Sequence, residues 1–273
     1  RERDDEIVLD VDISLKKGIY MREPFDEMNI SFLYKDEMIH IDDISMTRGK
    51  TFGVQANGVI PLMIKDYHNA PISLNTTFTN LPLSLISNII PDYYALGGLA
   101  SGSLFLNQHS AKGKKTQFDY DIDIINASFD LISLGNVKVS GDYDGEYFNI
   151  DQLSSVYKED LITSKGSIPF DLNLVSKNFG SISPNGIFSL KTKGDLYSLY
   201  FLSPYVSDLD SVRGKIEIEL NIEGKAESLK RNGKISISNG TMSTLLIDDD
   251  ITNIEGQAEI INNHMIINYF NAY

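Results

Sequence analysis

The residues that come closest to a chemical motif form a Gly-Lys-Thr triplet at residues 49–51. A phosphate-binding loop needs a further glycine five positions before the glycine of this triplet, because its backbone amides must wrap around the phosphates. Ile44 stands at that position, so we interpret the triplet as an ordinary turn. The sequence also lacks the G-x-S-x-G and H-E-x-x-H motifs of serine hydrolases and zinc proteases.

Two sets of possible metal ligands are equally incomplete. Asp119, Asp121 and Asp123 resemble the start of a calcium-binding loop, but Ile124 occupies the position that requires glycine. Alternation along a strand explains these carboxylates as a solvated face. The histidines lack the spacing of metal ligands: His40, His68, His109 and His264. The sequence therefore predicts a protein that is not an enzyme, with no catalytic residue, no metal and no other cofactor.

Composition narrows the possible partners. The chain has 273 residues, 42% of them hydrophobic, and a formal net charge of −14, which argues against nucleic acid because phosphate binding requires a basic surface. It has no cysteine and no apolar run of the roughly 18 residues that span a bilayer. Because it begins with Arg1 and ends just after a strand pattern, we expect a fragment of a longer protein, with any membrane anchor outside it.

The sequence predicts mainly strands, so strands must position any functional site. Apolar and polar residues alternate strongly over Ile7–Leu15, Phe118–Ile124, Ile168–Leu174 and Lys215–Ile222. This period of two is typical of antiparallel strands with one apolar and one polar face. Short apolar runs that stop near prolines predict two minor helices: Leu83–Ile90 and Leu196–Leu202.

One strand pattern recurs along the chain. The apolar residues of 38–45 fall on those of 147–154 at an offset of 109, and a third copy around 265–270 lies a further 117 along. Two-residue turns are expected just before the copies: Lys35-Asp36, Asp144-Gly145 and Asn262-Asn263. No linker interrupts the pattern, so we predict one continuous sheet over residues 1–273. Its approximate repeats are 7–117, 118–232 and an incomplete 233–273.

The third copy carries a resemblance to a known family. It reads as glycine-bounded strands at Gly214–Gly224 and Gly233–Gly240, then Ile254-Glu255-Gly256, a turn at Asn262-Asn263 and an apolar strand at Met265–Phe270. This order resembles the AsmA-like and TamB-like envelope proteins. The second copy matches at Tyr120–Ala127, Val139–Gly141, Asp144-Gly145 and Phe148–Leu153. The first copy lacks the glycine that Gly141 and Gly256 provide in the others.

The resemblance implies an elongated, curled antiparallel sheet, open like a taco, with a groove lined by aliphatic side chains. It implies a non-enzymatic protein of the periplasm and cell envelope of a diderm bacterium, anchored in the inner membrane by a segment outside this chain. The expected role is phospholipid transfer between the inner and outer membranes. An alternative is a factor for assembly or translocation of outer-membrane proteins, with an outer-membrane β-barrel as partner.

Alternation alone favours a structural β-sandwich repeat, in which the apolar faces pack on each other. The resemblance favours the groove, whose partners would be phospholipid acyl chains. The predicted groove-lining residues are the apolar members of the strongest strand patterns: Ile7, Leu9, Val11, Ile13, Phe118, Tyr120, Ile122, Ile124, Ile168, Phe170, Leu172, Ile216, Ile218, Leu220, Ile222, Ile235 and Ile237.

Overall fold

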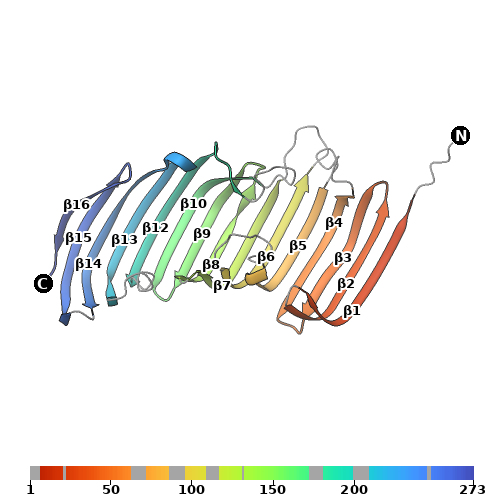
Figure 1. Cartoon of the computed structure of the whole chain (residues 1–273), viewed down its shortest axis with the longest axis horizontal. Coiled ribbons are helices and arrows are strands. Elements are labelled where there is room, and N and C mark those ends of the chain that lie inside the picture. The colour runs from red at the N-terminus through yellow and green to blue at the C-terminus, as the bar shows by residue number, and fades with distance from the viewer. Residues whose placement is uncertain are drawn as a thin grey trace.

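The chain forms a single antiparallel sheet in which strands follow one another in sequence order (Figure 1). The computed structural model describes residues 7–20, 23–62, 72–85, 96–108, 117–130, 132–171, 181–198, 209–244 and 247–273. The sheet has 16 strands, of which β11 is a two-residue strand that pairs only with β10. Each of the others pairs with its sequence neighbours, except that β10 pairs with β12.

The strands of the first part of the sheet are long and similar in length: β1 (Leu9–Tyr20), β2 (Glu23–Lys35), β3 (Met38–Arg48), β4 (Phe52–Pro61), β5 (Ile72–Pro82), β6 (Leu96–Gln108), β7 (Phe118–Phe129) and β8 (Ile132–Tyr143). The second part continues in the same way: β9 (Tyr147–Tyr157), β10 (Asp160–Asp171), β11 (Ser181–Ile182), β12 (Ile187–Ser198), β13 (Leu209–Lys225), β14 (Lys230–Thr244), β15 (Ile247–Ile261) and β16 (His264–Asn271). A 3₁₀ turn, η3 (Ala226–Ser228), joins β13 to β14.

The sheet is not closed. β1 pairs only with β2 and β16 only with β15, and Figure 1 shows these two strands at opposite ends of the molecule. The all-β fold class and the open, curled sheet predicted from the sequence are therefore confirmed. At about 4.8 Å between neighbouring strands, the sheet extends roughly 70 Å. The borders of the approximate repeats stay a prediction.

Tight turns fix the register of the hairpins. Asp36 and Glu37, between β2 and β3, both have positive φ, as do Asn262 and Asn263 between β15 and β16. Two successive positive φ values match the twist of the flanking strands. The first turn lies one residue later than the sequence predicted, because Lys35 still pairs with Met38 at the end of the ladder.

Bulges near one end of the strands bend the sheet. Register shifts occur where Asn80, Asn126, Asn239 and Asn253 adopt φ values between 50° and 52°. Asparagine tolerates this left-handed conformation better than most residues do. A bulge bends its strand and increases the local twist, and these bulges lie in four strands toward the same end of the ladder. They provide a local cause for the curl.

Helical structure is scarcer than expected. The helix predicted at Leu196–Leu202 is wrong for residues 196–198, which belong to β12, and Leu196 pairs with Ile216. Leu196 is only 3% exposed, so its burial in the sheet has outweighed the local helical pattern. Of the stretch Leu83–Ile90, residues 84–85 are helical and residues 86–90 lie outside the described part. Within that part, no helix has the length and apolarity needed to cross a membrane.

Candidate functional site

Register pairing places the predicted groove residues on one face of the sheet. Directly opposed residues of an antiparallel pair project to the same side. Phe118 opposes Tyr143, which opposes Phe148, which in turn opposes Ile168. Farther along, Gly194 opposes Ile218, and Ile218 opposes Ile235. Following such pairs from β1 to β16 defines one continuous surface, which we call the apolar face.

The predicted residues that lie in described strands all belong to this face. They are Leu9, Val11 and Ile13 in β1; Phe118, Tyr120, Ile122 and Ile124 in β7; Ile168 and Phe170 in β10; Ile216, Ile218, Leu220 and Ile222 in β13; and Ile235 and Ile237 in β14. Ile7 precedes β1 and is 71% exposed, so the structure does not place it within the sheet. Leu172 lies outside the described residues.

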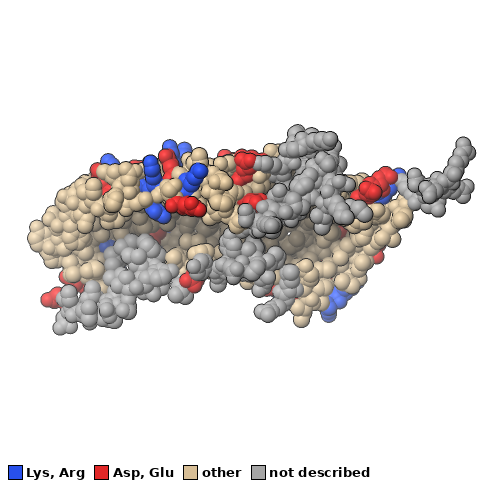
Figure 2. Space-filling model, turned by 45° about the horizontal axis from the view of Figure 1, so that its top comes forward, with Lys and Arg blue, Asp and Glu red and all other residues tan. Residues whose placement is uncertain are grey.

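The reverse side of the sheet, which we call the polar face, is charged. The side chains of Asp119, Asp121 and Asp123 lie there and are exposed, as alternation predicted. Ion pairs cross this face, including Lys138 Nζ to Asp123 Oδ1 at 3.2 Å and Lys193 Nζ to Glu219 Oε1 at 2.7 Å. Figure 2 shows charged side chains gathered along one wall and a recess of mostly uncharged residues running below it.

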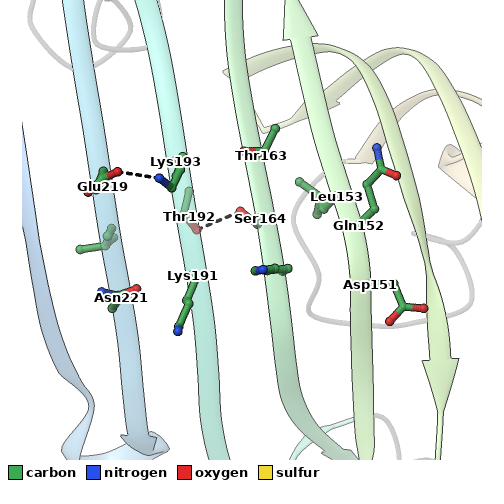
Figure 3. A pocket seen from close by; sticks show the side chains of 12 residues that line it. Asp151, Gln152, Leu153, Thr163, Ser164, Lys191, Thr192, Lys193, Glu219 and Asn221 are labelled. Carbon is green, nitrogen blue, oxygen red and sulfur yellow. Dashed lines mark hydrogen bonds and ion pairs between the residues drawn. The ribbon is translucent and has the colours of Figure 1, made fainter.

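A pocket of about 570 Å³ over β9, β10, β12 and β13 is lined by polar and charged residues together with Leu153 and Leu220 (Figure 3). Lys191, Lys193 and Glu219 contribute to it, and Ser164 and Thr192 share a hydrogen bond of 2.8 Å there. Charged groups lose favourable hydration when an alkyl chain covers them, so this pocket is poorly suited to a greasy ligand. Within the described residues, no group of three or more His, Cys, Asp and Glu is arranged to hold a metal ion.

Five rings pack together on the apolar face toward one end of the strands. We call them the aromatic cluster: Phe118, Tyr120, Tyr143, Phe148 and Phe170. The ring centroids of Phe118 and Tyr143 are 5.2 Å apart, and those of Phe148 and Phe170 are 5.4 Å apart. Tyr143 is 1% exposed, and its hydroxyl donates to the carbonyl oxygen of Phe170 at 3.1 Å. These rings therefore bury much of their apolar surface against one another.

Tyr120 joins this cluster to the backbone. Its hydroxyl donates to the carbonyl oxygen of Asn149 at 2.9 Å. Burial, and then the nearby carboxylates of Asp142 and Asp151, raise the pKa of Tyr120 to about 12. The phenol therefore stays protonated and keeps its donor over the whole neutral range.

The lack of a side chain at Gly141 leaves room for the Tyr120 side chain to reach the backbone of β9. Gly141 lies directly opposite Tyr120 in the ladder. A Cβ at Gly141 would come 1.9 Å from the carbonyl oxygen of Asn149 and 2.8 Å from the Tyr120 hydroxyl oxygen. Any side chain here would therefore push β8 away from β9. The sequence motif Val139–Gly141 thus marks a close approach of strands in the floor of the face.

The apolar face of β13 and β14 is different, because it contains only aliphatic side chains. We call it the aliphatic stretch: Ile216, Ile218, Leu220, Ile222, Ile235 and Ile237. Ile216 is 4% exposed, but the other five are only partly buried. Its neighbours across the ladder include Gly194, Gly233 and Gly256, which present no side chain to it. A partly exposed aliphatic surface next to glycines can accept an alkyl chain.

Many residues of the apolar face were not predicted from the sequence, because they lie in strands without uninterrupted alternation. Missed residues with apolar side chains on this face include Phe32, Ile41, Val54, Phe78, Leu104, Val139, Ile150, Leu190 and Ile254. Small residues such as Gly58 and Thr76 interrupt the pattern, and the extra residue in β3 between Ile41 and Ile44 shifts its period. The alternation of apolar and polar residues on either side of each interruption was the signal that could have identified these residues.

Two further apolar clusters lie at the other end of the strands. Phe25, Met46 and Phe52 form one, and Phe78, Leu83 and Ala100 form the other. Leu83 follows β5, so the chain beyond this strand helps to bury the edge of the face. These two clusters therefore pack side chains at one margin of the face over β2 to β6. No family model, curated protein or solved structure matches this chain in the three comparisons with known proteins.

Proposed function

We propose that the apolar face binds phospholipid acyl chains and that the protein is a non-enzymatic lipid conduit. One observation supports this most strongly: a single, largely apolar face runs along the whole path of an open sheet from β1 to β16. Exposed apolar surface of this extent is usually an interaction site. An alkyl chain is a ligand whose shape and chemistry match a long surface without specific polar contacts.

Binding energy of the required size is available from burial alone. Transfer of one CH₂ group from water to an apolar surface gives about 0.8 kcal/mol. A chain of about 16 carbons could therefore gain on the order of ten kcal/mol before the cost of ordering it. Because the contacts are non-directional, neighbouring positions along the face are similar in energy. A lipid could then shift from strand to strand while its headgroup stays in water.

The proposed setting is the bacterial envelope, with transfer of phospholipid between the inner and outer membranes. It rests on the sequence resemblance to AsmA-like and TamB-like proteins, and the polar, acidic reverse face is compatible with an aqueous compartment. The proposal gives the aliphatic stretch the role of a binding surface and no residue a catalytic one.

A second candidate function is assembly of outer-membrane proteins by strand addition. It is favoured by the open sheet, in which β1 and β16 each pair with only one other described strand, because an extended client segment can add to such an edge. A structural β-sandwich is less well supported. It would require a second sheet against the apolar face, and the described strands form one sheet only.

Lipid extraction from the purified chain, followed by mass spectrometry, tests the conduit. We expect recovered phospholipid, and rebinding of a fluorescent acyl probe after delipidation. Ile218→Asp places a carboxylate in the aliphatic stretch and should abolish probe binding while leaving the far-ultraviolet circular dichroism unchanged, because Ile218 is only partly buried.

The matched control is Asn221→Asp, which adds the same carboxylate to the polar face of the same strand. Equal binding by this variant and the unmodified chain would localise the lipid to the apolar face. A stable, delipidated chain that binds no probe would refute the conduit, as would equal loss of binding in both variants.

A further inference from the structure

A charged side chain lies on the apolar face at one end of the aliphatic stretch. Arg231, near the start of β14, directly opposes Ile222 of β13. Opposed residues of an antiparallel pair project to the same side, and Gly233 and Ile235 continue that row along β14. The aliphatic stretch therefore begins beside a guanidinium group.

The other end of the stretch is apolar. Ile216, which opposes Ile237, is 4% exposed, and Ile254 on the next strand is 5% exposed. From Ile222 to Ile216 the strand advances six residues, or roughly 20 Å at about 3.3 Å per residue. An acyl chain spans one leaflet of a hydrocarbon core about 30 Å thick, so a chain lying along β13 fits this length. The stretch thus has the polarity of a phospholipid, with a cationic end and an apolar end.

The Asn262-Asn263 turn holds the start of β14 in place. The Oδ1 atom of Asn263 accepts hydrogen bonds from the backbone nitrogen of Arg231 at 2.9 Å and from its Nη1 at 3.4 Å. The backbone nitrogen of Asn263 donates to the Arg231 carbonyl oxygen at 3.1 Å, and its Nδ2 donates to the Leu229 carbonyl oxygen at 2.8 Å. These contacts fix the position from which the Arg231 side chain extends.

The guanidinium group of Arg231 keeps most of its donors for a ligand. Among the residues that the structure describes, no carboxylate forms an ion pair with it, and its side chain is exposed. Arg48, which opposes Phe52 elsewhere on the face, differs in both respects. Its Nη1 lies 3.3 Å from Oε2 of Glu23, and its guanidinium carbon lies 5.5 Å from the centre of the Phe52 ring. The positive charge of Arg48 is therefore already compensated, whereas that of Arg231 is not.

We propose that Arg231 binds the phosphate group of a phospholipid whose acyl chain lies along the aliphatic stretch with its end toward Ile216. This inference rests on the proposed function and adds to it a headgroup contact and an orientation. The planar guanidinium group can donate two parallel hydrogen bonds to phosphate oxygens. Because Arg231 is exposed, the headgroup remains in water while the acyl chain is covered. A lipid that moves from strand to strand is then held longest at β14.

Calorimetric titration with two ligands of the same acyl chain tests the phosphate contact. The ligands are lysophosphatidylcholine and a monoacylglycerol, each below its micelle concentration. Arg231→Gln should weaken binding of lysophosphatidylcholine by about tenfold, because it removes a charged hydrogen-bond donor. Binding of the monoacylglycerol, which has no phosphate, should stay unchanged.

The matched control is Arg213→Gln, which removes the same charge at the far end of β13, opposite Thr241. It should bind both ligands as the unmodified chain does. Inorganic phosphate, titrated alone at the concentrations used for the lipids, distinguishes a headgroup site from a site for a free anion. We expect no heat of binding from it, because a single exposed charge contributes little without the acyl chain.

The orientation is tested by quenching. A fluorophore is attached to a single cysteine at residue 218 or 222, and the lysophospholipid carries a nitroxide at the end of its acyl chain. We expect stronger quenching at 218 than at 222, because 218 lies farther from Arg231 along the strand. Arg231→Gln should reduce this difference.

The possible failures are distinguishable. If neither ligand binds the unmodified chain, both the conduit and the Arg231 contact are refuted. If both ligands bind but Arg231→Gln weakens neither, or weakens both equally, the contact is refuted and the conduit is not. Equal weakening by Arg213→Gln, binding of inorganic phosphate as tight as that of the lipid, or stronger quenching at 222 would also overturn the inference.

Discussion

The aromatic cluster and the aliphatic stretch lie on the same face of the same sheet, but their side chains have different partners. In the cluster, ring centroids of neighbouring residues are 5.1 to 6.3 Å apart, and Tyr143 is 1% exposed. In the stretch, Ile218 and Leu220 remain partly exposed, and each has a glycine on one side in the ladder, Gly194 and Gly233 respectively. The first region is packed against itself, whereas the second is free to contact something else.

This difference separates stability from binding on one surface. Rings that contact each other contribute mainly to the free energy of unfolding, because their contacts with one another are already made in the folded chain. Aliphatic side chains that remain exposed contribute less to folding and keep most of their burial energy for a ligand.

The largest expected effect on stability is in the cluster. Tyr143→Ala should lower the free energy of unfolding by about 3 to 5 kcal/mol, because it removes a fully buried ring and leaves a cavity. Ile218→Ala in the stretch should cost only about 1 kcal/mol, because part of that side chain is already in water. Urea denaturation of both variants measures the two values. Similar losses would show that the two regions are equally packed.

A smaller loss is expected when the floor of the cluster is filled. Gly141→Ala should cost about 1 to 3 kcal/mol, because its Cβ would collide with the Asn149 carbonyl oxygen. Gly53→Ala is the control, since its Cβ would meet nothing within 4 Å, and it should change stability by less than about 0.5 kcal/mol. If both changes were neutral, β8 and β9 would not need their close approach.

A pH-dependent effect is expected from Tyr120. Its pKa is raised from 10.0 to about 12 in the folded chain, so folding favours the protonated phenol. Its contribution to stability is complete below pH 10 and is lost as the pH rises toward 12. The difference in unfolding free energy between the unmodified chain and Tyr120→Phe should therefore shrink over that interval. A constant difference would mean that protonation of the Tyr120 phenol is not linked to folding.

The smallest effect is expected on the polar face behind the stretch. Lys193 and Glu219 form an ion pair whose side chains are 73% and 60% exposed. Solvent screens such pairs, so Lys193→Ala should leave the free energy of unfolding nearly unchanged. Added salt should reduce even that difference. A larger effect, measured by the same denaturation, would assign the stability of this region to its polar face.

The sequence predicted the strands with uninterrupted alternation and the face on which their apolar residues lie. Phe118–Ile124 and Lys215–Ile222 are the clearest examples, since both fall within observed strands. Side chains project alternately from an extended backbone, so a period of two is a direct consequence of strand geometry. Residues in strands with glycine or a bulge, such as Ile150 beside Gly141 and Gly166, gave no such continuous signal.

Other features of the fold depend on contacts between strands, which a local sequence pattern does not encode. Leu196 belongs to a short apolar run that fits a helix as well as a strand, and pairing with Ile216 decides the outcome. Alternation alone also favoured a closed sandwich over the open groove that the structure shows. The difference lies in whether another layer covers the apolar face, which no single strand pattern encodes.

An environment-sensitive fluorophore attached along β13 offers the most direct test of acyl-chain binding to the apolar face. The chain has no cysteine, so one cysteine at a time can be introduced and labelled at residues 217 to 222. On titration with a lysophospholipid below its micelle concentration, we expect a blue shift at 218, 220 and 222 and none at 217, 219 and 221. Equal shifts at odd and even positions, or no shift at any of them, would contradict lipid binding to this face.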